Sequence, residues 1–216
     1  MTVSLYPKVQ DYCTNLSASF SLIPEERKSQ LLKLSQYFLN KYQQGITPQA
    51  IVICTHNSRR SHLGQLWLAI GADHYQLPTL NSYSGGTEAT ALNPRVASAL
   101  VRVGLNVSTA QAKAENPVYE ISWIADMQPY QAFSKKFEHP ANPQDKFAAI
   151  MVCNEADQGC PFVPGTDFRL SLPYDDPKAF DETPLESQKY DERCEQIGRE
   201  MLFVLSELKK QWNVNG

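Results

Sequence analysis

Cys54 and Arg60 stand six positions apart, with five small, polar or basic residues between them. A β-branched apolar run over residues 50–53 precedes the cysteine, and a helical pattern begins at Ser61. The expected arrangement is a strand, a loop and the start of a helix. The first N–H groups of a helix have no intrahelical acceptor and lie at the positive end of its dipole, so such a loop can surround a tetrahedral oxyanion. The spacing therefore predicts an oxyanion site with a thiol at its base and a guanidinium at its side.

The residue types suit nucleophilic chemistry on such an anion. Helix N-termini and nearby cations favour the nucleophilic thiolate form of a cysteine, so Cys54 is the predicted nucleophile. The planar guanidinium of Arg60 can hold two oxygens of the anion, also when its geometry becomes bipyramidal. Asn57, in mid-loop, accepts a left-handed backbone that turns successive N–H groups inward. The alternative is that Cys54 is simply a small buried residue at a strand end.

The segments around this loop occur in the order found in a known family. They are Cys54-Thr55-His56-Asn57-Ser58-Arg59-Arg60-Ser61, Ser82-Tyr83-Ser84-Gly85-Gly86-Thr87-Glu88, Leu92-Asn93-Pro94, Val103-Gly104-Leu105, Cys153-Asn154-Glu155-Ala156-Asp157-Gln158-Gly159-Cys160-Pro161 and Tyr174-Asp175-Asp176-Pro177. Over about residues 48–108 and 146–210 the chain thus resembles low-molecular-weight protein tyrosine phosphatases and the related thioredoxin-coupled arsenate reductases. The resemblance implies an oxyanion site formed by Thr55, His56, Asn57, Ser58, Arg59, Arg60 and Ser61, with the loop supported by Asn57, Ser61 and Ser84.

Two further cysteines distinguish the reactions that share this loop. Cys153 follows a continuous apolar run, residues 147–152, which predicts a buried parallel strand ending at the same sheet edge as Cys54. In the arsenate reductases that the chain resembles, Cys54 would attack arsenate, Cys153 would attack the Cys54 sulfur and release arsenite, and Cys160 would attack Cys153. Thioredoxin would reduce the resulting disulfide. Because a disulfide needs Cα atoms about 5.5–6 Å apart, the segment between the last two cysteines must fold back or partly unwind.

The alternative function is that of a low-molecular-weight phosphatase acting on phosphotyrosine proteins or small phosphomonoesters. Cys54 would then take the phosphoryl group and Asp176 would protonate the leaving oxygen. Asp176 is preferred over Asp175 because it directly precedes Pro177, as in the family's Asp-Pro loop. The residues that follow, Lys178-Ala179-Phe180, lack the aromatic pattern usual in such phosphatases. A third possibility, a silent phosphate-binding module, is disfavoured by the complete set of catalytic residues, and arsenate reduction is the preferred function.

Three loop-region residues depart from or add to the family pattern. Arg59 stands where many relatives have a second cysteine, and its charge would favour anion capture. Gln65 stands where relatives have a glutamate that, in some reductases, supports a potassium ion. No potassium, other metal or cofactor is therefore expected, although the amide could orient Asn57. His56 is expected to face solvent.

Composition predicts an ordinary enzyme-sized protein. The chain has 216 residues, of which 42% are hydrophobic and 20% charged, and a formal charge of −3. This charge gives no reason to expect nucleic acid as a partner. No apolar run is long enough to span a membrane, and the start of the chain lacks the features of a signal peptide. Because five cysteines without such a signal favour reduced thiols, a cytoplasmic location is expected.

The predicted fold is a three-layer α/β domain with a four-stranded parallel sheet, of the low-molecular-weight phosphatase type. Strands are expected over residues 50–53, 80–84, 105–108 and 147–152, and helices over residues 61–70, 94–103 and 186–211, with a frayed tail.

Two regions lie outside the family likeness. Residues 1–45 are expected to form a helical N-terminal extension, with one helix over about 6–16 and a stronger one over about 24–44, ahead of a catalytic domain over 46–216. Residues 109–145 form an insertion in which 118–123 and 130–133 alternate as the strands of a hairpin. Such a hairpin could flank the active site or merely decorate the sheet edge.

Overall fold

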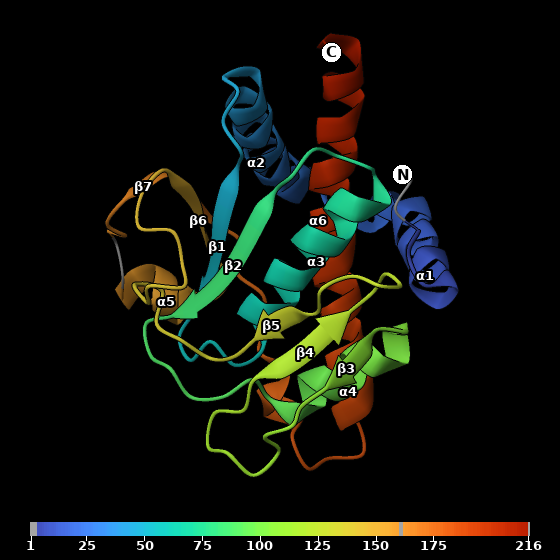
Figure 1. Cartoon of the computed structure of the whole chain (residues 1–216), viewed down its shortest axis with the longest axis vertical. Coiled ribbons are helices and arrows are strands. Elements are labelled where there is room, and N and C mark those ends of the chain that lie inside the picture. Colours follow the sequence, from blue (N-terminus) through green and yellow to red (C-terminus); the bar gives the residue numbers. More distant parts are fainter. Residues whose placement is uncertain (1–3, 160–161, 216) are drawn as a thin grey trace.

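The computed structural model of the protein describes residues 4–159 and 162–215. At its centre is a parallel sheet of four strands in the order β2-β1-β6-β7 (Figure 1). These strands are β1 (Gln49–Cys54), β2 (Asn81–Gly86), β6 (Phe147–Met151) and β7 (Thr166–Ser171). The two central strands β1 and β6 are buried along almost their whole length. The predicted three-layer α/β class with a four-stranded parallel sheet is confirmed.

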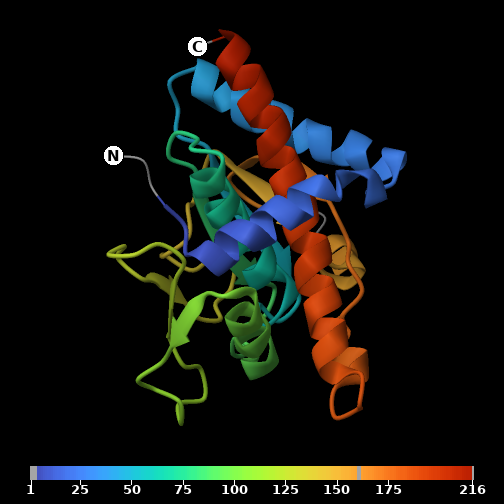
Figure 2. The same ribbon diagram turned by 90° about the vertical axis from the view of Figure 1, so that its right-hand side faces the viewer.

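The long C-terminal helix α6 (Glu186–Asn215) is the element on which most other helices pack. Helix α3 (Arg60–His74) contacts β1, β2 and α6, and α4 (Pro94–Val103) also contacts α6. The short α5 (Asn154–Gly159) follows β6 and contacts β1. Figure 2 shows α6 running the length of the molecule, crossed by the two N-terminal helices. Helix α6 therefore joins the sheet layer to the N-terminal part of the chain.

The two predicted N-terminal helices are confirmed as α1 (Pro7–Ala18) and α2 (Glu25–Gln43), with a 3-10 turn, η1 (Phe20–Leu22), between them. Both pack on α6. Their residues Val9, Leu34 and Phe38 are fully buried in the core that also contains the sheet. The first 45 residues thus contribute apolar side chains to the core of the whole protein.

A second, antiparallel sheet has the order β3-β4-β5 and consists of β3 (Asn106–Ser108), β4 (Tyr119–Ser122) and β5 (Tyr130–Ala132). The predicted hairpin is confirmed, because β4 pairs with β5. The expectation that residues 105–108 join the parallel sheet is wrong. Both Asn106 and Ser108 are exposed, and a strand of the parallel sheet interior would have to bury them without partners. The fourth parallel strand is instead β7, an edge strand whose partly buried, mixed side chains gave no apolar run to detect.

Helix α4 has the predicted ends. The Asn93 side-chain oxygen accepts from the Arg95 N–H at 2.9 Å, and Pro94 occupies the first turn. Gly104 ends the helix at φ +113°, a left-handed conformation that disfavours other residues.

Two other helix ends differ from expectation. Helix α3 begins one residue early, at Arg60, and continues past Gly71 to His74. Gly71 lies against α6, where a Cβ atom would be 2.6 Å from Leu205 Cδ1, so this glycine allows close helix packing and does not end the helix. Helix α6 continues through Asn215 instead of fraying after residue 211, and the Trp212 ring lies 5.3 Å from that of Tyr42.

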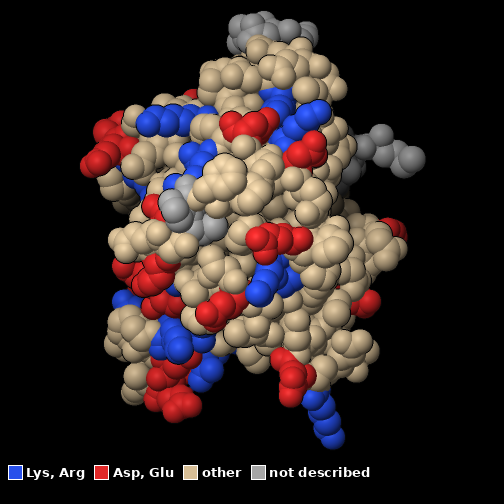
Figure 3. Space-filling view, turned by 90° about the vertical axis from the view of Figure 1, so that its left-hand side faces the viewer, with Lys and Arg blue, Asp and Glu red and all other residues tan. Residues whose placement is uncertain are grey.

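The surface carries both signs of charge. On the face shown in Figure 3, acidic and basic side chains are interspersed among uncharged ones. Within the described residues, no helix combines the length and the apolarity needed to cross a membrane.

Candidate active site

The loop of residues 55–59 joins β1 to α3 and has an unusual distribution of backbone hydrogen bonds. Every carbonyl from Cys54 to Arg59 is hydrogen-bonded by a flanking group. The donors are the N–H groups of Thr87, Glu88, Asn93 and Leu63, the hydroxyls of Thr87, Thr90 and Ser134, and the ring of His62. In contrast, the N–H groups of residues 55–60 donate to no group within the described chain. The loop therefore has its carbonyls satisfied from outside and a row of free donors left for a ligand.

Asn57 and Gly86 make this shape possible. Asn57 has the predicted left-handed backbone, with φ +43°. Gly86, at the end of β2, lies directly against the loop. A Cβ atom there would be 2.6 Å from the Thr55 oxygen and 2.8 Å from the Asn57 nitrogen. Only a residue without a side chain allows this approach.

Cys54 lies at the base of the loop, 4% exposed, with its Sγ 3.1 Å from the Ser61 hydroxyl. The direction of this hydrogen bond follows from its neighbours. The Lys135 backbone N–H donates to Asn57 Oδ1 at 2.8 Å, which leaves Asn57 Nδ2 to donate to Ser61 Oγ at 2.9 Å. Because Ser61 Oγ accepts from Asn57, its own hydrogen is directed at the Cys54 sulfur. This chain of hydrogen bonds therefore ends on the Cys54 sulfur.

His62 supports the loop from below. Its Nε2 lies 2.9 Å from the Asn57 carbonyl, which can only accept, and its Nδ1 lies 3.3 Å from the Ser84 hydroxyl. Burial, together with the charge of Lys135, lowers the pKa of His62 to about 3, so the ring is neutral. Ser84, predicted to support the loop, thus acts through His62.

Sequence reasoning did not identify His62 or Lys135. For His62 a signal exists, because it lies one helical turn before the buried Leu66 on the same face of α3. For Lys135 the sequence has no signal, because it contributes a backbone N–H that nearly any residue carries.

The structure brings the side chains of Arg60 and Asp176 together. The guanidinium is 8% exposed, donates through Nη1 to the Tyr174 carbonyl at 2.7 Å and pairs through Nη2 with Asp176 Oδ2 at 2.8 Å. Its Nε is buried and has no acceptor in the described structure. The other Asp176 oxygen accepts from the Lys178 N–H at 3.0 Å, which caps the 3-10 turn η2 (Pro177–Phe180). The loop that carries Asp176 is therefore anchored to Arg60, at the end of the loop that follows β1.

Two departures from the family pattern act differently from expectation. The Arg59 guanidinium is not directed at an anion, because it donates to Tyr190 at 2.8 Å and pairs with Asp181 at 3.4 Å. Its contribution to the loop is its backbone N–H. Gln65 does not orient Asn57 but donates to the Tyr130 hydroxyl at 2.8 Å, because α3 directs it toward the inserted hairpin.

The other predicted loop residues lie as follows. The His56 side chain is 49% exposed, as expected, and lies 3.6 Å from Glu88. Ser58 is buried, and its carbonyl accepts from the Asn93 N–H at 2.9 Å.

Cys153 lies beside the loop, fully buried at the end of β6. Strand β6 pairs with β1, and the Val152 N–H donates to the Ile53 carbonyl at 2.9 Å, so both strands deliver their cysteines to the same sheet edge. The Cys153 Sγ lies 3.4 Å from Thr55 Oγ1 of the loop. Cys160, the third predicted redox cysteine, lies outside the described residues.

The parallel sheet and the helices around it form a three-layer α/β fold of the low-molecular-weight phosphatase type. An arsenate reductase of Staphylococcus epidermidis is 27% identical over 128 residues, which cover 58% of this chain and 75% of that relative. Arsenate reductase 2 of Staphylococcus haemolyticus is 29% identical over 126 residues, with the same shares of both chains. No protein-family model matches the chain.

A solved structure supports the fold. The crystal structure of a YwlE mutant from Bacillus subtilis superposes with a TM-score of 0.50 at 15% identity, covering 76% of this chain and 99% of that chain. The resemblance to arsenate reductases seen in the sequence is confirmed by these relatives, and the superposition supports the fold.

Proposed function

We propose that this enzyme reduces arsenate, with Cys54 as the nucleophile and Cys153 and Cys160 as a redox relay. The observation that carries this proposal is the position of Cys153. Its sulfur lies 3.4 Å from Thr55 Oγ1, on the loop that starts at Cys54. The unpaired N–H groups of residues 55–60 and the free Nε of Arg60 support binding of a tetrahedral oxyanion above Cys54. The relatives named arsenate reductase support arsenate as this anion.

The proposed reaction balances as a two-electron reduction. The Cys54 thiolate bonds to arsenic, and one arsenate oxygen leaves as water. Cys153 then attacks the Cys54 sulfur, the As–S bond breaks, and its electron pair stays on arsenic, which leaves as arsenite. Cys160 attacks the Cys153 sulfur, so that Cys54 is released as a thiolate and a Cys153–Cys160 disulfide remains. A dithiol protein of the thioredoxin type in the cytoplasm would reduce this disulfide.

Helix α5 must unwind for the last step. Positions seven residues apart along a helix are separated by about 10 Å, whereas disulfide Cα atoms lie about 4.4–6.8 Å apart. The helix has six residues and buries only Ala156, so little apolar contact opposes its opening. The Asp157 side chain holds it to β7 by pairing with Arg169 and accepting from the Ser171 hydroxyl at 2.8 Å. We infer that these contacts break when the relay disulfide forms.

Phosphomonoester hydrolysis is the second candidate function, and the pairing of Asp176 with Arg60 favours it. A carboxyl group held at the loop by the anion-binding arginine is positioned to protonate a leaving oxygen. Hydrolysis needs no second cysteine, so the two activities are separable by mutation.

The test replaces Cys153 and Cys160 separately by serine and measures both reactions. We expect arsenate-dependent oxidation of reduced thioredoxin to disappear in both variants, while any aryl phosphate hydrolysis survives. The matched control is Cys13→Ala, because burial raises the pKa of the Cys13 thiol to about 12 and keeps it protonated at neutral pH. Unchanged arsenate reduction in either serine variant would disprove the relay.

A further inference from the structure

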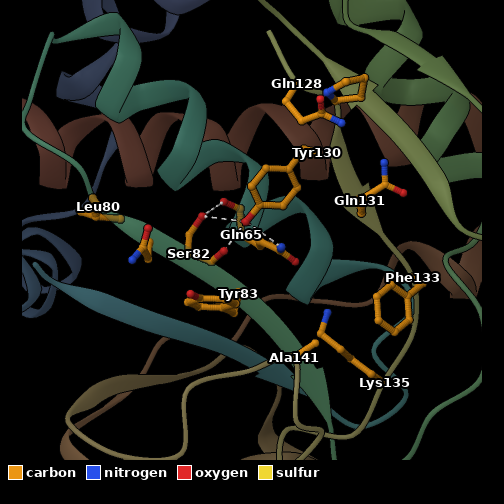
Figure 4. Close-up of a pocket in the computed structure, with 12 residues that line it drawn as sticks. Gln65, Leu80, Ser82, Tyr83, Gln128, Tyr130, Gln131, Phe133, Lys135 and Ala141 are labelled. Carbon is orange, nitrogen blue, oxygen red and sulfur yellow. Dashed lines mark hydrogen bonds between the residues drawn. The ribbon is translucent and has the colours of Figure 1, made fainter.

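A cavity of about 400 Å³ lies between the edge of β2 and residues 128–141 of the insertion (Figure 4). Its walls include the aromatic rings of Tyr83, Tyr130 and Phe133 and the amides of Gln65 and Gln128. None of the residues that line it is acidic. Its size suits a ligand of one or two rings.

One lysine projects into this cavity without a counter-ion. Lys135 is 5% exposed, and Figure 4 shows its side chain directed toward the middle of the cavity. Its Nζ lies 4.6 Å from the centre of the Phe133 ring, and in the part of the chain that the structure describes it makes no ion pair and no hydrogen bond. An ammonium withdrawn from water without a carboxylate is unfavourable. Burial accordingly lowers the pKa of Lys135 to about 8.

The edge of β2 adds a donor to the same wall. Asn81 donates its N–H to the Pro48 carbonyl on the β1 side, so the next residue, Ser82, directs its backbone groups to the outer edge of the sheet. The Ser82 carbonyl accepts from the Tyr130 hydroxyl. Its N–H has no acceptor among the described side chains and loops.

Gln65 adds a hydrogen-bond acceptor to the cavity wall. Its Nε2 is used by the Tyr130 hydroxyl, but its Oε1 is buried and has no donor in the described structure. The cavity thus combines a cation, a backbone donor and a lone acceptor with aromatic walls.

We propose that this cavity is a binding site for a small aromatic carboxylate, with the Lys135 ammonium as its counter-ion. The carboxylate of the ligand supplies the negative charge that would pair with the Lys135 ammonium, and the ring of the ligand lies between the aromatic side chains. The site is separate from the oxyanion loop and does not depend on the reaction at Cys54. It is nevertheless connected to that loop, because the backbone N–H of Lys135 donates to Asn57.

The test titrates the full-length protein with 2-naphthoate by calorimetry, in excess inorganic phosphate to occupy the oxyanion loop. We expect saturable binding at one site, and binding about tenfold or more weaker for Lys135→Met, because this variant cannot form the charged hydrogen bond to the carboxylate. The matched control is Lys136→Met, because the neighbouring Lys136 side chain is exposed and lies outside this cavity. The neutral isostere 2-naphthamide should bind more weakly than 2-naphthoate to the unmodified protein. Absence of binding, equal binding of the two probes, or equal loss in both lysine variants would overturn the proposal.

A second measurement needs no variant. Binding of 2-naphthoate to the unmodified protein should weaken as the pH rises from 7 through about 8 to 9.5, because Lys135 loses its proton in this range. Burial lowers the pKa of the nearby His62 to about 3 and raises the pKa of Tyr83 and Tyr130 in the cavity wall. Lys136, Glu138 and His139 line a second pocket that Lys135 also borders, and they do not line this cavity. An affinity that is constant across this range would exclude the lysine as the counter-ion.

Discussion

Replacing Ser61 by alanine tests whether the donor chain ending on Cys54 contributes to its reactivity. The Ser61 hydroxyl lies 3.1 Å from the Cys54 sulfur and receives its own hydrogen bond from Asn57 at 2.9 Å. Ser61 is completely buried, so water does not replace the missing hydroxyl. The variant removes one donor from the sulfur and leaves Cys54, Arg60 and the loop backbone in place.

The size of the effect follows from the charge on sulfur. A hydrogen bond to a charged group contributes about 1.5–3 kcal/mol, and about 1.4 kcal/mol corresponds to a tenfold change in rate. We therefore expect the Ser61→Ala variant to react about 10- to 100-fold more slowly at neutral pH. The freed Asn57 amide should also reduce the free energy of unfolding by about 1–3 kcal/mol, because a buried donor is left unpaired.

The assay separates thiolate reactivity from anion binding. Alkylation of Cys54 by iodoacetamide, followed by mass spectrometry, involves no oxyanion, so it should slow by the same factor as turnover of arsenate or aryl phosphate. The control is Ser98→Ala, which removes an exposed hydroxyl that donates to the Pro94 carbonyl within α4. Alkylation within twofold of the unmodified rate would refute the proposed direction of the donor chain.

Two further variants examine the supports of the loop. For His62→Gln, urea unfolding should show a smaller loss of stability as the pH falls. In the unmodified protein, the imidazole of the unfolded chain binds a proton below about pH 6.5, whereas the buried imidazole stays neutral down to about pH 3. His62 therefore lowers the free energy of unfolding by up to about 1.4 kcal/mol per pH unit between about pH 6 and 4. Equal slopes in the variant and the unmodified protein would argue against a neutral, buried imidazole. For Gly86→Ala, a Cβ atom would lie 2.2 Å from the Glu88 oxygen and 2.6 Å from that of Thr55, so the loop must move. Inhibition by phosphate should therefore weaken about tenfold or more, which corresponds to a loss of about 1.4 kcal/mol in the free energy of binding. Gly159→Ala is its control, because no atom of the described residues lies within 4 Å of a Cβ there, and a similar effect in both variants would remove the steric explanation.

Features that depend on residues close together in the chain were predictable. The oxyanion loop follows from an apolar strand, a left-handed Asn57 and a helix start, all within a dozen positions. The ends of α4 follow in the same way from Asn93, Pro94 and Gly104. In each case the backbone conformation depends on the residue itself and its nearest neighbours.

The supports of the loop were not predictable in the same way. Lys135 reaches Asn57 across 78 positions of sequence through its backbone N–H, so its side chain carries no sign of this role. Gln65 donates to Tyr130 of the inserted hairpin and not to Asn57 of the loop. These partners are chosen by how the insertion packs against β2.

The two edge strands also show that local sequence does not determine which distant segment a strand pairs with. Residues 106–108 and β7 are both short and mixed in polarity, yet one joins the hairpin sheet and the other the parallel sheet. For such edge strands, hydrophobic periodicity is weak, and the choice of neighbour is made by the surrounding layers.

The sequence by itself determined the residue types on which the proposed chemistry depends: a cysteine and an arginine at loop spacing, a second cysteine at the end of a buried strand, and an acid before a proline. Only the tertiary structure decided which groups hold those residues in place and that a lysine is left unpaired in a cavity. The physical reason is that the types and spacing of reactive residues can be read from the sequence, whereas hydrogen-bond partners and buried charges depend on which distant segments meet when the core forms.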